Sequence, residues 1–141
     1  MQVLFIDLNN HLSFKDGYIQ ALRQAGFEVI LPDEEIRASA DFIEKARTLD
    51  ELDLIITEQR MNVPENWSPD FCQQGTRVGN EIIRRVRITH PDLPVVILTG
   101  IYDDDDREKN QHKLNVYYFR DWETSRACLV KIVHEILDLT D

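Results

Sequence analysis

The sequence is poor in cysteine and has no long apolar run. Its two cysteines, Cys72 and Cys128, form no CxxC pattern and have no histidine cluster near them. They therefore indicate neither a zinc site nor a disulfide framework, and a reduced, cytosolic setting fits them best. The first residues, MQVLFIDLNN, lack the basic start and apolar stretch of a secretion signal. No apolar run approaches the roughly 18–20 residues that cross a bilayer, so no membrane segment is expected.

Basic charge and reactive constellations are also scarce. The chain has 16 Lys and Arg against 26 Asp and Glu, a net charge of −10, which argues against direct binding of nucleic acid. A local basic patch at Arg84, Arg85 and Arg87 is interpreted as a solvated helix face. The four histidines have no metal-ligand spacing, and neither a nucleophile–base set nor a Gly-rich phosphate loop is present. We expect no metal, no cofactor and no enzymatic activity.

Apolar runs alternate with segments of helical periodicity along the 141 residues. Ser13 and Asp16 resemble a capping box that opens the first helix, which Gly26 ends. This order, (βα)5, predicts an α/β fold with a doubly wound, five-stranded parallel sheet in a single domain, residues 1–141. The expected strands are 3–6, 27–31, 54–57, 95–98 and 116–119, and the expected helices are about 13–25, 34–49, 77–89 and 123–138, with weaker helical character at 103–113.

The segment 59–76 shows no period and contains two prolines, a glycine and Trp67. It is therefore predicted to be a long loop, of the kind that is often functional or mobile. Trp67 either pins this loop to the body of the protein or anchors a partner. We favour pinning.

Four polar residues follow the predicted strands. Asp7, Glu58, Thr99 and Asp121 lie at or just after strand ends. Because functional groups gather at the carboxyl ends of parallel strands, these side chains are expected to meet at one edge of the sheet.

Several segments together resemble the receiver domain of two-component response regulators, a flavodoxin-like fold. VLFIDLNN resembles its first strand, DLIITEQRM its third, EIIRRVRITHPDLPVVILTG its third helix and fourth strand, and NVYYFRDW its fifth strand. The resemblance makes Glu58 the phospho-acceptor position, Thr99 and Tyr118 the switch pair, and Asp121 the position of a lysine. The 22-residue spacing from Thr99 to Asp121 matches the family without a gap.

The departures from the family concern the phosphorylation chemistry. The second metal-binding acid is replaced by Leu8, the acceptor aspartate by Glu58 and the lysine by Asp121. Phosphoryl transfer to a carboxylate needs a cation and a lysine to neutralise charge. Glutamate would also misplace the acceptor oxygen by about 1.5 Å, roughly one C–C bond. Ordinary phosphorylation is therefore not expected, and the long segment 59–76 is a further departure from the family.

Three carboxylates, Asp7, Glu58 and Asp121, would converge with no lysine among them. Because like charges at close range disfavour ionisation, a compensating cation is expected, and we hypothesise that Arg60 or Arg120 supplies it. Glu58 itself has three interpretations: an inert remnant, a constitutive mimic of the acyl phosphate that holds Thr99 and Tyr118 in one state, or an unusual acceptor or metal site.

The resemblance implies a signalling module that binds a protein partner, such as a kinase, an effector or a transcriptional regulator, in the cytoplasm. It also implies a possible homodimer through the face formed by residues 103–113, 116–120 and 123–137. No output domain follows residue 138, so we expect a stand-alone regulator or a domain of a longer protein. The alternative is a metal- or ligand-binding protein or enzyme on a flavodoxin-like fold, which would use the carboxylate cluster.

Overall fold

A single parallel sheet forms the centre of this protein. The structure is a computed structural model, and it describes residues 1–7, 15–32, 49–61, 67, 77–100, 107, 108, 110, 113 and 115–140. Five strands pair in parallel in the order β2-β1-β3-β4-β5. The predicted five-stranded parallel sheet is therefore confirmed, with bounds that differ from the predicted ones by a residue or less. The strands are β1 (Gln2–Ile6), β2 (Glu28–Ile30), β3 (Leu54–Thr57), β4 (Val95–Thr99) and β5 (Val116–Arg120).

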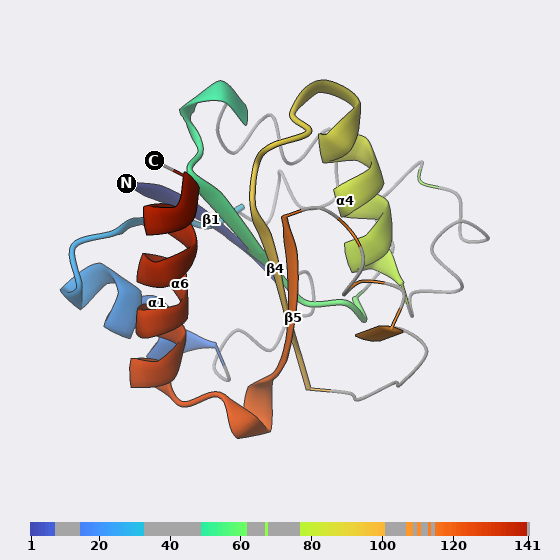
Figure 1. The fold of residues 1–141 in the computed structure, drawn as a ribbon. Coiled ribbons are helices and arrows are strands. Elements are labelled where there is room, and N and C mark those ends of the chain that lie inside the picture. The colour runs from blue at the N-terminus through green and yellow to red at the C-terminus, as the bar shows by residue number, and fades with distance from the viewer. Residues whose placement is uncertain are drawn as a thin grey trace.

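The described long helices cover both faces of the sheet. Figure 1 shows α1 and α6 together on one face and α4 on the other. This is the doubly wound arrangement that right-handed crossovers between parallel strands produce. Apart from Leu49, the predicted helix at 34–49 lies outside the described residues. The helices are α1 (Asp16–Gln24), α4 (Val78–Thr89) and α6 (Arg126–Thr140), with the short 3-10 turns η2 (Leu49–Glu51) and η3 (Asp121–Glu123).

Two apolar clusters hold the layers together. Along β1, Leu4 and Ile6 belong to the cluster on the α4 side, whereas Val3 and Phe5 belong to the cluster shared with α1 and α6. Successive side chains of a strand point to opposite faces, so a strand that is apolar at every position serves both clusters. All five residues of β4 are buried for this reason.

The start of α1 differs from the prediction. The N-cap residue is Lys15, and the helix begins at Asp16, not near Ser13 as the capping-box pattern suggests. A lysine is a poor N-cap, because its charge opposes the positive end of the helix dipole. Its side chain instead reaches the carboxylates of Glu58 and Asp121.

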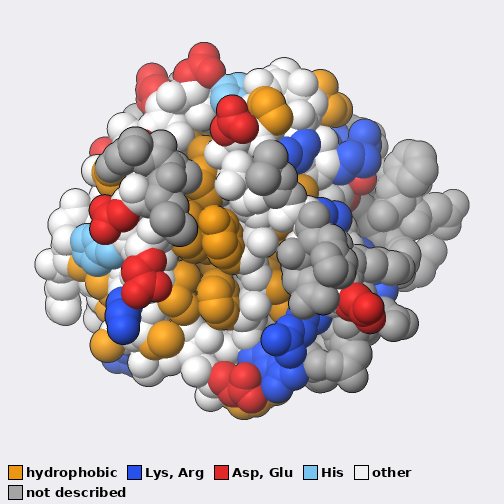
Figure 2. All heavy atoms as spheres, viewed as in Figure 1, with side chains coloured by type: hydrophobic (Ala, Val, Ile, Leu, Met, Phe, Trp, Pro, Cys, Tyr) orange, Lys and Arg blue, Asp and Glu red, His pale blue; other side chains and the backbone are white. Residues whose placement is uncertain are grey.

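The β5 edge of the sheet is less covered than its centre. Val116 is buried, but the other four residues of β5 are half-buried. Figure 2 shows hydrophobic side chains gathered in the middle of this view, where α6 and β5 lie in Figure 1. The half-buried Tyr117 and Phe119 of β5 pack on the α1–α6 side of the core. Among the described helices, none has the length and apolar character needed to cross a membrane.

Candidate functional site

The predicted site residues lie where parallel strands end. Asp7 follows β1, Glu58 follows β3, Thr99 ends β4 and Asp121 follows β5. Asp7, Glu58 and Thr99 are buried, with 6%, 8% and 0% of their surface exposed. The Asp121 side chain is 23% exposed. The site therefore places charged groups in a largely dry environment, where an unpaired charge is costly.

The Glu58 carboxylate is bound on both oxygens. Its Oε1 accepts a hydrogen bond from the backbone N–H of Gln59 at 2.9 Å. Its Oε2 accepts one from the backbone N–H of Gly100 at 3.3 Å, just beyond the end of β4. The same Oε2 lies 3.4 Å from the Nζ of Lys15. Two backbone amides and one ammonium thus hold this side chain in place.

Lys15 is the functional residue that the sequence reasoning missed. Its Nζ bridges Oε2 of Glu58, at 3.4 Å, and Oδ2 of Asp121, at 3.5 Å. Lys15 is only 3% exposed, so these contacts are made away from bulk water. A buried ammonium is tolerated when carboxylates pair with it, and here one cation serves two carboxylates. The expectation that the carboxylates meet with no lysine among them was therefore wrong.

Lys15 comes from the start of α1, whereas Asp121 follows β5. The two residues are 106 positions apart in the sequence, so the fold brings this cation to the site from a distant element. A sequence signal did exist: the electrostatic argument calls for a cation, and the helix that follows β1 begins at the carboxyl edge of the sheet. A survey of every cation expected at that edge would have included Lys15.

The turn that carries Asp121 is tied to α1. The Tyr18 hydroxyl lies 2.9 Å from the carbonyl oxygen of Asp121 and 2.6 Å from that of Thr124. Burial, with the charge of Asp121 as a smaller cause, raises the pKa of Tyr18 above its usual value. The hydroxyl therefore stays protonated at neutral pH and acts as a donor to this turn. α1 thus supplies both the cation that meets the Asp121 carboxylate and a hydrogen bond that holds its backbone.

Glycine at position 100 leaves room for the Asp121 carboxylate. A Cβ at Gly100 would lie 2.9 Å from Oδ2 of Asp121, closer than side-chain atoms normally approach. Gly100 therefore lets this carboxylate come close to the end of β4, while its own N–H donates to Glu58.

The residue after Glu58 connects the site to α4. The side-chain oxygen of Gln59 accepts a hydrogen bond from the N–H of Asn80 at 2.8 Å, and its backbone oxygen accepts one from Gly79 at 3.2 Å. A Cβ at Gly79 would lie 2.5 Å from Oε1 of Gln59 and 2.9 Å from the Glu58 carbonyl oxygen. These bonds satisfy N–H groups that the first turn of a helix leaves without partners. A change in the position of Glu58 would therefore also move the first turn of α4, through Gln59.

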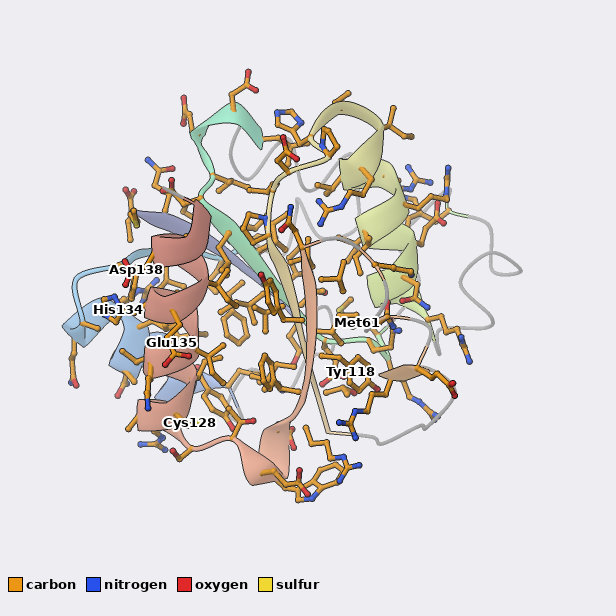
Figure 3. The ribbon with its side chains drawn as sticks, viewed as in Figure 1. Met61, Tyr118, Cys128, His134, Glu135 and Asp138 are labelled. Carbon is orange, nitrogen blue, oxygen red and sulfur yellow. The ribbon has the colours of Figure 1, made fainter. Side chains whose placement is uncertain are left out.

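The remaining predicted residues are placed as follows. Tyr118 of β5 is half-buried and packs against the α4-side cluster, to which Met61 also belongs (Figure 3). Arg120 forms an ion pair with Glu123, with 3.0 Å between Nη1 of the arginine and Oε1 of the glutamate. Arg60 is half-buried. That either arginine also compensates the pocket stays a prediction, and Leu8 lies outside the described residues.

Trp67 is the described residue of the stretch 62–76. It is 4% exposed and belongs to the α4-side core. The guanidinium carbon of Arg85, on α4, lies 4.0 Å from the centre of its ring. Trp67 therefore packs against the body of the protein, as the pinning interpretation predicts.

The described residues offer little to a metal ion. Within this part of the chain, no three carboxylate, histidine or cysteine side chains are grouped closely enough to hold one. The arrangement around Glu58 instead consists of hydrogen-bond donors and an ammonium, which bind anionic oxygen.

Comparison with known proteins identifies the fold. No family model and no curated protein matches this sequence. A CheY-like receiver domain protein from Methanospirillum hungatei is similar in structure, with a TM-score of 0.70 and 15% identity over 99% of this chain and 94% of that one. A putative response regulator from Chloroflexus aurantiacus has a TM-score of 0.68 and 21% identity, with 97% of each chain covered. An orphan response regulator of H. pylori has a TM-score of 0.68 and 15% identity, with 97% and 96% covered.

Proposed function

We propose that this chain, which has the fold of response-regulator receiver domains, is a receiver-like signalling module that acts by protein–protein interaction without ordinary phosphorylation. The observation that carries the proposal is the bridge from Lys15 to Glu58 and Asp121. The Lys15 ammonium already pairs with two carboxylates of the pocket in which a working receiver would gather a metal ion. It therefore takes the place that the positive charge of the metal ion would have beside Glu58 and Asp121.

The acceptor itself is also unsuited to the reaction. Both Glu58 oxygens accept hydrogen bonds, and the carboxylate is buried. A nucleophile in this state would have to give up these contacts before it attacked phosphorus. Since Leu8 offers no oxygen ligand, the position of the second acid cannot bind Mg²⁺.

Of the three interpretations of Glu58, the constitutive mimic is the one we adopt. A phosphoryl group attracts backbone N–H groups and an ammonium, and the Glu58 carboxylate has contacts of both kinds. One of these donors, Gly100, directly follows Thr99, and Gln59 links the site to α4. In the proposed state, Glu58 keeps the ends of β3 and β4 together permanently, with Tyr118 packed against the α4-side core.

Treatment with a small phosphodonor and with beryllofluoride tests this proposal. After incubation with acetyl phosphate and Mg²⁺, intact mass should show no phosphoryl adduct. Thermal melting with Mg²⁺ and beryllofluoride should leave the melting temperature unchanged, because a ligand stabilises only a protein that binds it. A canonical receiver domain treated in parallel is the positive control. A stoichiometric adduct would overturn the proposal, and a large upward shift with Mg²⁺ alone would favour the alternative, a metal- or ligand-binding protein.

We also propose that the β5–α6 face takes part in the interaction, including a possible homodimer. Trp122 is 56% exposed beside this face, with the Arg120 guanidinium 5.8 Å from its ring centre. Half-buried Tyr117 and Phe119 continue the apolar surface across β5. Exposed aromatic residues and arginine are enriched at interfaces. Most of the expected segment 103–113 lies outside the described residues.

Sedimentation equilibrium of the wild type and of Trp122→Glu tests the homodimer. A concentration-dependent dimer that Trp122→Glu weakens at least tenfold, about 1.4 kcal/mol, is the expected result. Ile88→Glu is a matched control, because Ile88 is 71% exposed on α4, away from this face. Equal weakening by both substitutions, or a monomer at every concentration, would contradict a homodimer through this face.

A further inference from the structure

The Lys15 ammonium lies midway between two carboxylates from different parts of the sheet edge. Its Nζ is 3.4 Å from Oε2 of Glu58, which follows β3, and 3.5 Å from Oδ2 of Asp121, which follows β5. A hydrogen bond between an ammonium and a carboxylate is usually shorter, about 2.7–2.9 Å. The two carboxylates therefore share this cation, and neither holds it at the optimal distance. If one of them lost its charge, the ammonium would move toward the other.

Asp121 is part of a turn that is closed by its own hydrogen bonds. It is the first residue of η3, and the backbone N–H of Thr124 donates to its carbonyl oxygen at 3.1 Å. The Thr124 hydroxyl donates to the carbonyl oxygen of Arg120 at 2.7 Å. These bonds connect both ends of the segment 120–124, so a displacement of Asp121 would move the whole turn.

The first turn of α1 supports η3 from the other side. The Tyr18 hydroxyl lies within hydrogen-bonding distance of the carbonyl oxygens of Asp121, at 2.9 Å, and Thr124, at 2.6 Å. A Cβ at Gly17 would overlap the guanidinium of Arg126, so this glycine lets the first side chain of α6 lie against α1. Together with the ammonium contact, these interactions join α1 to the segment between β5 and α6.

η3 carries Trp122, which belongs to the proposed interaction face. Trp122 is 56% exposed, and the guanidinium carbon of Arg120, the last residue of β5, lies 5.8 Å from its ring centre. A movement of η3 would therefore change the position of the indole ring relative to β5. Lys15 itself is 3% exposed and does not line this face, so it can affect the face only through such a movement.

We propose that Lys15 is a positioning residue, which connects the charge of Glu58 to the position of Trp122 through Asp121. While Glu58 is ionised, the ammonium is shared and η3 keeps the position described above. Without that charge, the ammonium moves onto Asp121 and draws η3 toward α1. This inference rests on the proposed function, because it explains how a constitutive mimic at Glu58 would fix the interaction face. It adds a connection that does not pass through Tyr118.

Fluorine NMR of protein labelled with 5-fluorotryptophan tests the connection. The chain has two tryptophans, Trp67 and Trp122, so the spectrum has two resonances, which Trp122→Phe assigns. Glu58→Gln removes one charge at the site and should shift the Trp122 resonance. In a Lys15→Met background the same substitution should shift it by less than about a third as much, because coupled residues have non-additive effects. An equal shift in both backgrounds, or no shift by Glu58→Gln alone, would overturn the proposal.

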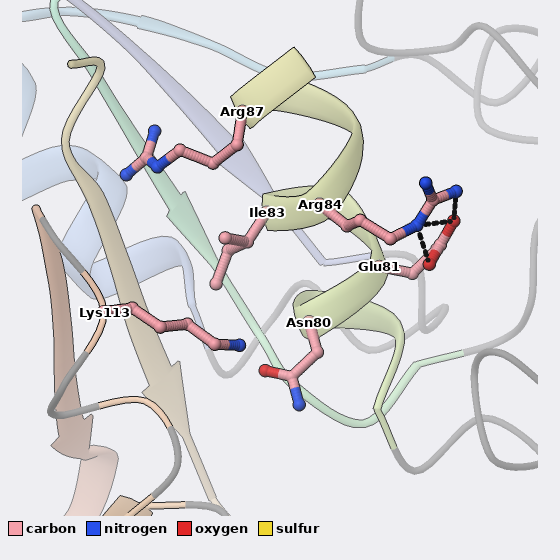
Figure 4. Close-up of a pocket in the computed structure, with 6 residues that line it drawn as sticks. All are labelled: Asn80, Glu81, Ile83, Arg84, Arg87 and Lys113. Carbon is pink, nitrogen blue, oxygen red and sulfur yellow. Dashed lines mark hydrogen bonds and ion pairs between the residues drawn. The ribbon is translucent and has the colours of Figure 1, made fainter. Parts of the chain in front are cut away.

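Glu81→Gln is the matched control, because it also removes the charge of a buried carboxylate. Figure 4 shows Glu81 bonded to Arg84 on α4, and its second partner, Arg85, lies over the Trp67 ring. The control should therefore shift the Trp67 resonance and leave the Trp122 resonance in place. If it moved the Trp122 resonance as far as the substitution at the site does, the shift would reflect a general loosening and the proposal would be refuted.

A second background keeps the test decisive if Lys15→Met fails to fold by circular dichroism. Asp121→Asn then replaces it, because this variant leaves one ammonium with one carboxylate. Glu58→Gln in this background should again shift the Trp122 resonance by less than about a third of its effect in the wild type. An undiminished shift would overturn the proposal. No phosphodonor is present in these spectra, so a phosphoryl adduct in the earlier experiment would refute the proposed function without changing the result for Lys15.

Discussion

Two buried carboxylates in this protein pair with cations in different ways. Glu58 and Glu81 are both buried, with 8% and 4% of their surface exposed. Glu58 shares a single lysine with Asp121, and that lysine is itself buried. Glu81 has two arginines to itself, with side chains that are 58% and 36% exposed.

The two sites differ in the number of cations on each carboxylate and in the sequence separation between the carboxylate and its cations. The arginines that bind Glu81 are three and four residues further along α4, so any helix that forms there brings them together. Lys15 lies 43 positions from Glu58, and only the assembled sheet and α1 bring the two together. The Glu58 site should therefore fail when one side chain is removed, whereas the Glu81 site should tolerate such a loss.

Removal of Lys15 should have the largest effect. Lys15→Met keeps an apolar side chain of similar length but leaves Glu58 and Asp121 without their ammonium. Loss of one partner of a buried ion pair typically costs about 3–5 kcal/mol, and we expect a destabilisation in this range. Urea denaturation at pH 7 measures it. Lys131→Met, at an exposed position, should cost less than about 0.5 kcal/mol.

A double variant separates lost charge pairing from lost packing. Glu58→Gln in the Lys15→Met background removes one of the two uncompensated carboxylates, so the double variant should be more stable than Lys15→Met alone. If the double variant is less stable than Lys15→Met, the ion pair between Lys15 and Glu58 contributes little to stability. The proposal that Glu58 is a constitutive mimic would then lose its main support.

Removal of the Glu81 charge should have a smaller effect. Glu81→Gln keeps the shape but weakens the hydrogen bonds to Arg84, and we expect a cost of about 1 kcal/mol because both arginines are partly exposed. Since the pKa of Glu81 is lowered in the folded protein, its contribution is present above about pH 4.5, the ordinary value, and is lost as the pH falls through the lower folded value. Urea denaturation from pH 7 to pH 3 should therefore show a smaller acid loss in Glu81→Gln. An identical pH dependence in both proteins would contradict this assignment.

The smallest effect is expected at Arg85. Arg85→Ala removes the cation above the Trp67 ring and one of two cations on Glu81, which together contribute about 0.5–1 kcal/mol at a partly exposed site. Thermal denaturation measures this, and tryptophan fluorescence in a Trp122→Phe background, where Trp67 is the remaining tryptophan, reports whether the ring stays buried. A loss as large as that of Lys15→Met would show that the Glu81 site is no more redundant than the Glu58 site.

The layout of the sheet could be predicted because its signals are local. Runs such as Leu54–Thr57 and Val95–Leu98 are apolar at nearly every position, as strands covered on both faces must be. Parallel pairing places the carboxyl ends of these strands at one edge of the sheet. The sequence therefore predicts that Glu58, Thr99 and Asp121 lie at that edge. The start of α1 was mispredicted: the N-cap is Lys15, whose ammonium also contacts two carboxylates that are far away in the sequence.

Local sequence patterns specify a parallel α/β protein with a carboxylate just after its third strand and no lysine directly after its fifth. Hydrophobic periodicity and residue identity carry that information, and both are read within a few neighbouring positions. Which cation pairs with these carboxylates depends on the tertiary structure. A charge–charge contact depends on distance in space, and the fold brings Lys15 to partners that are 43 and 106 positions away in the chain.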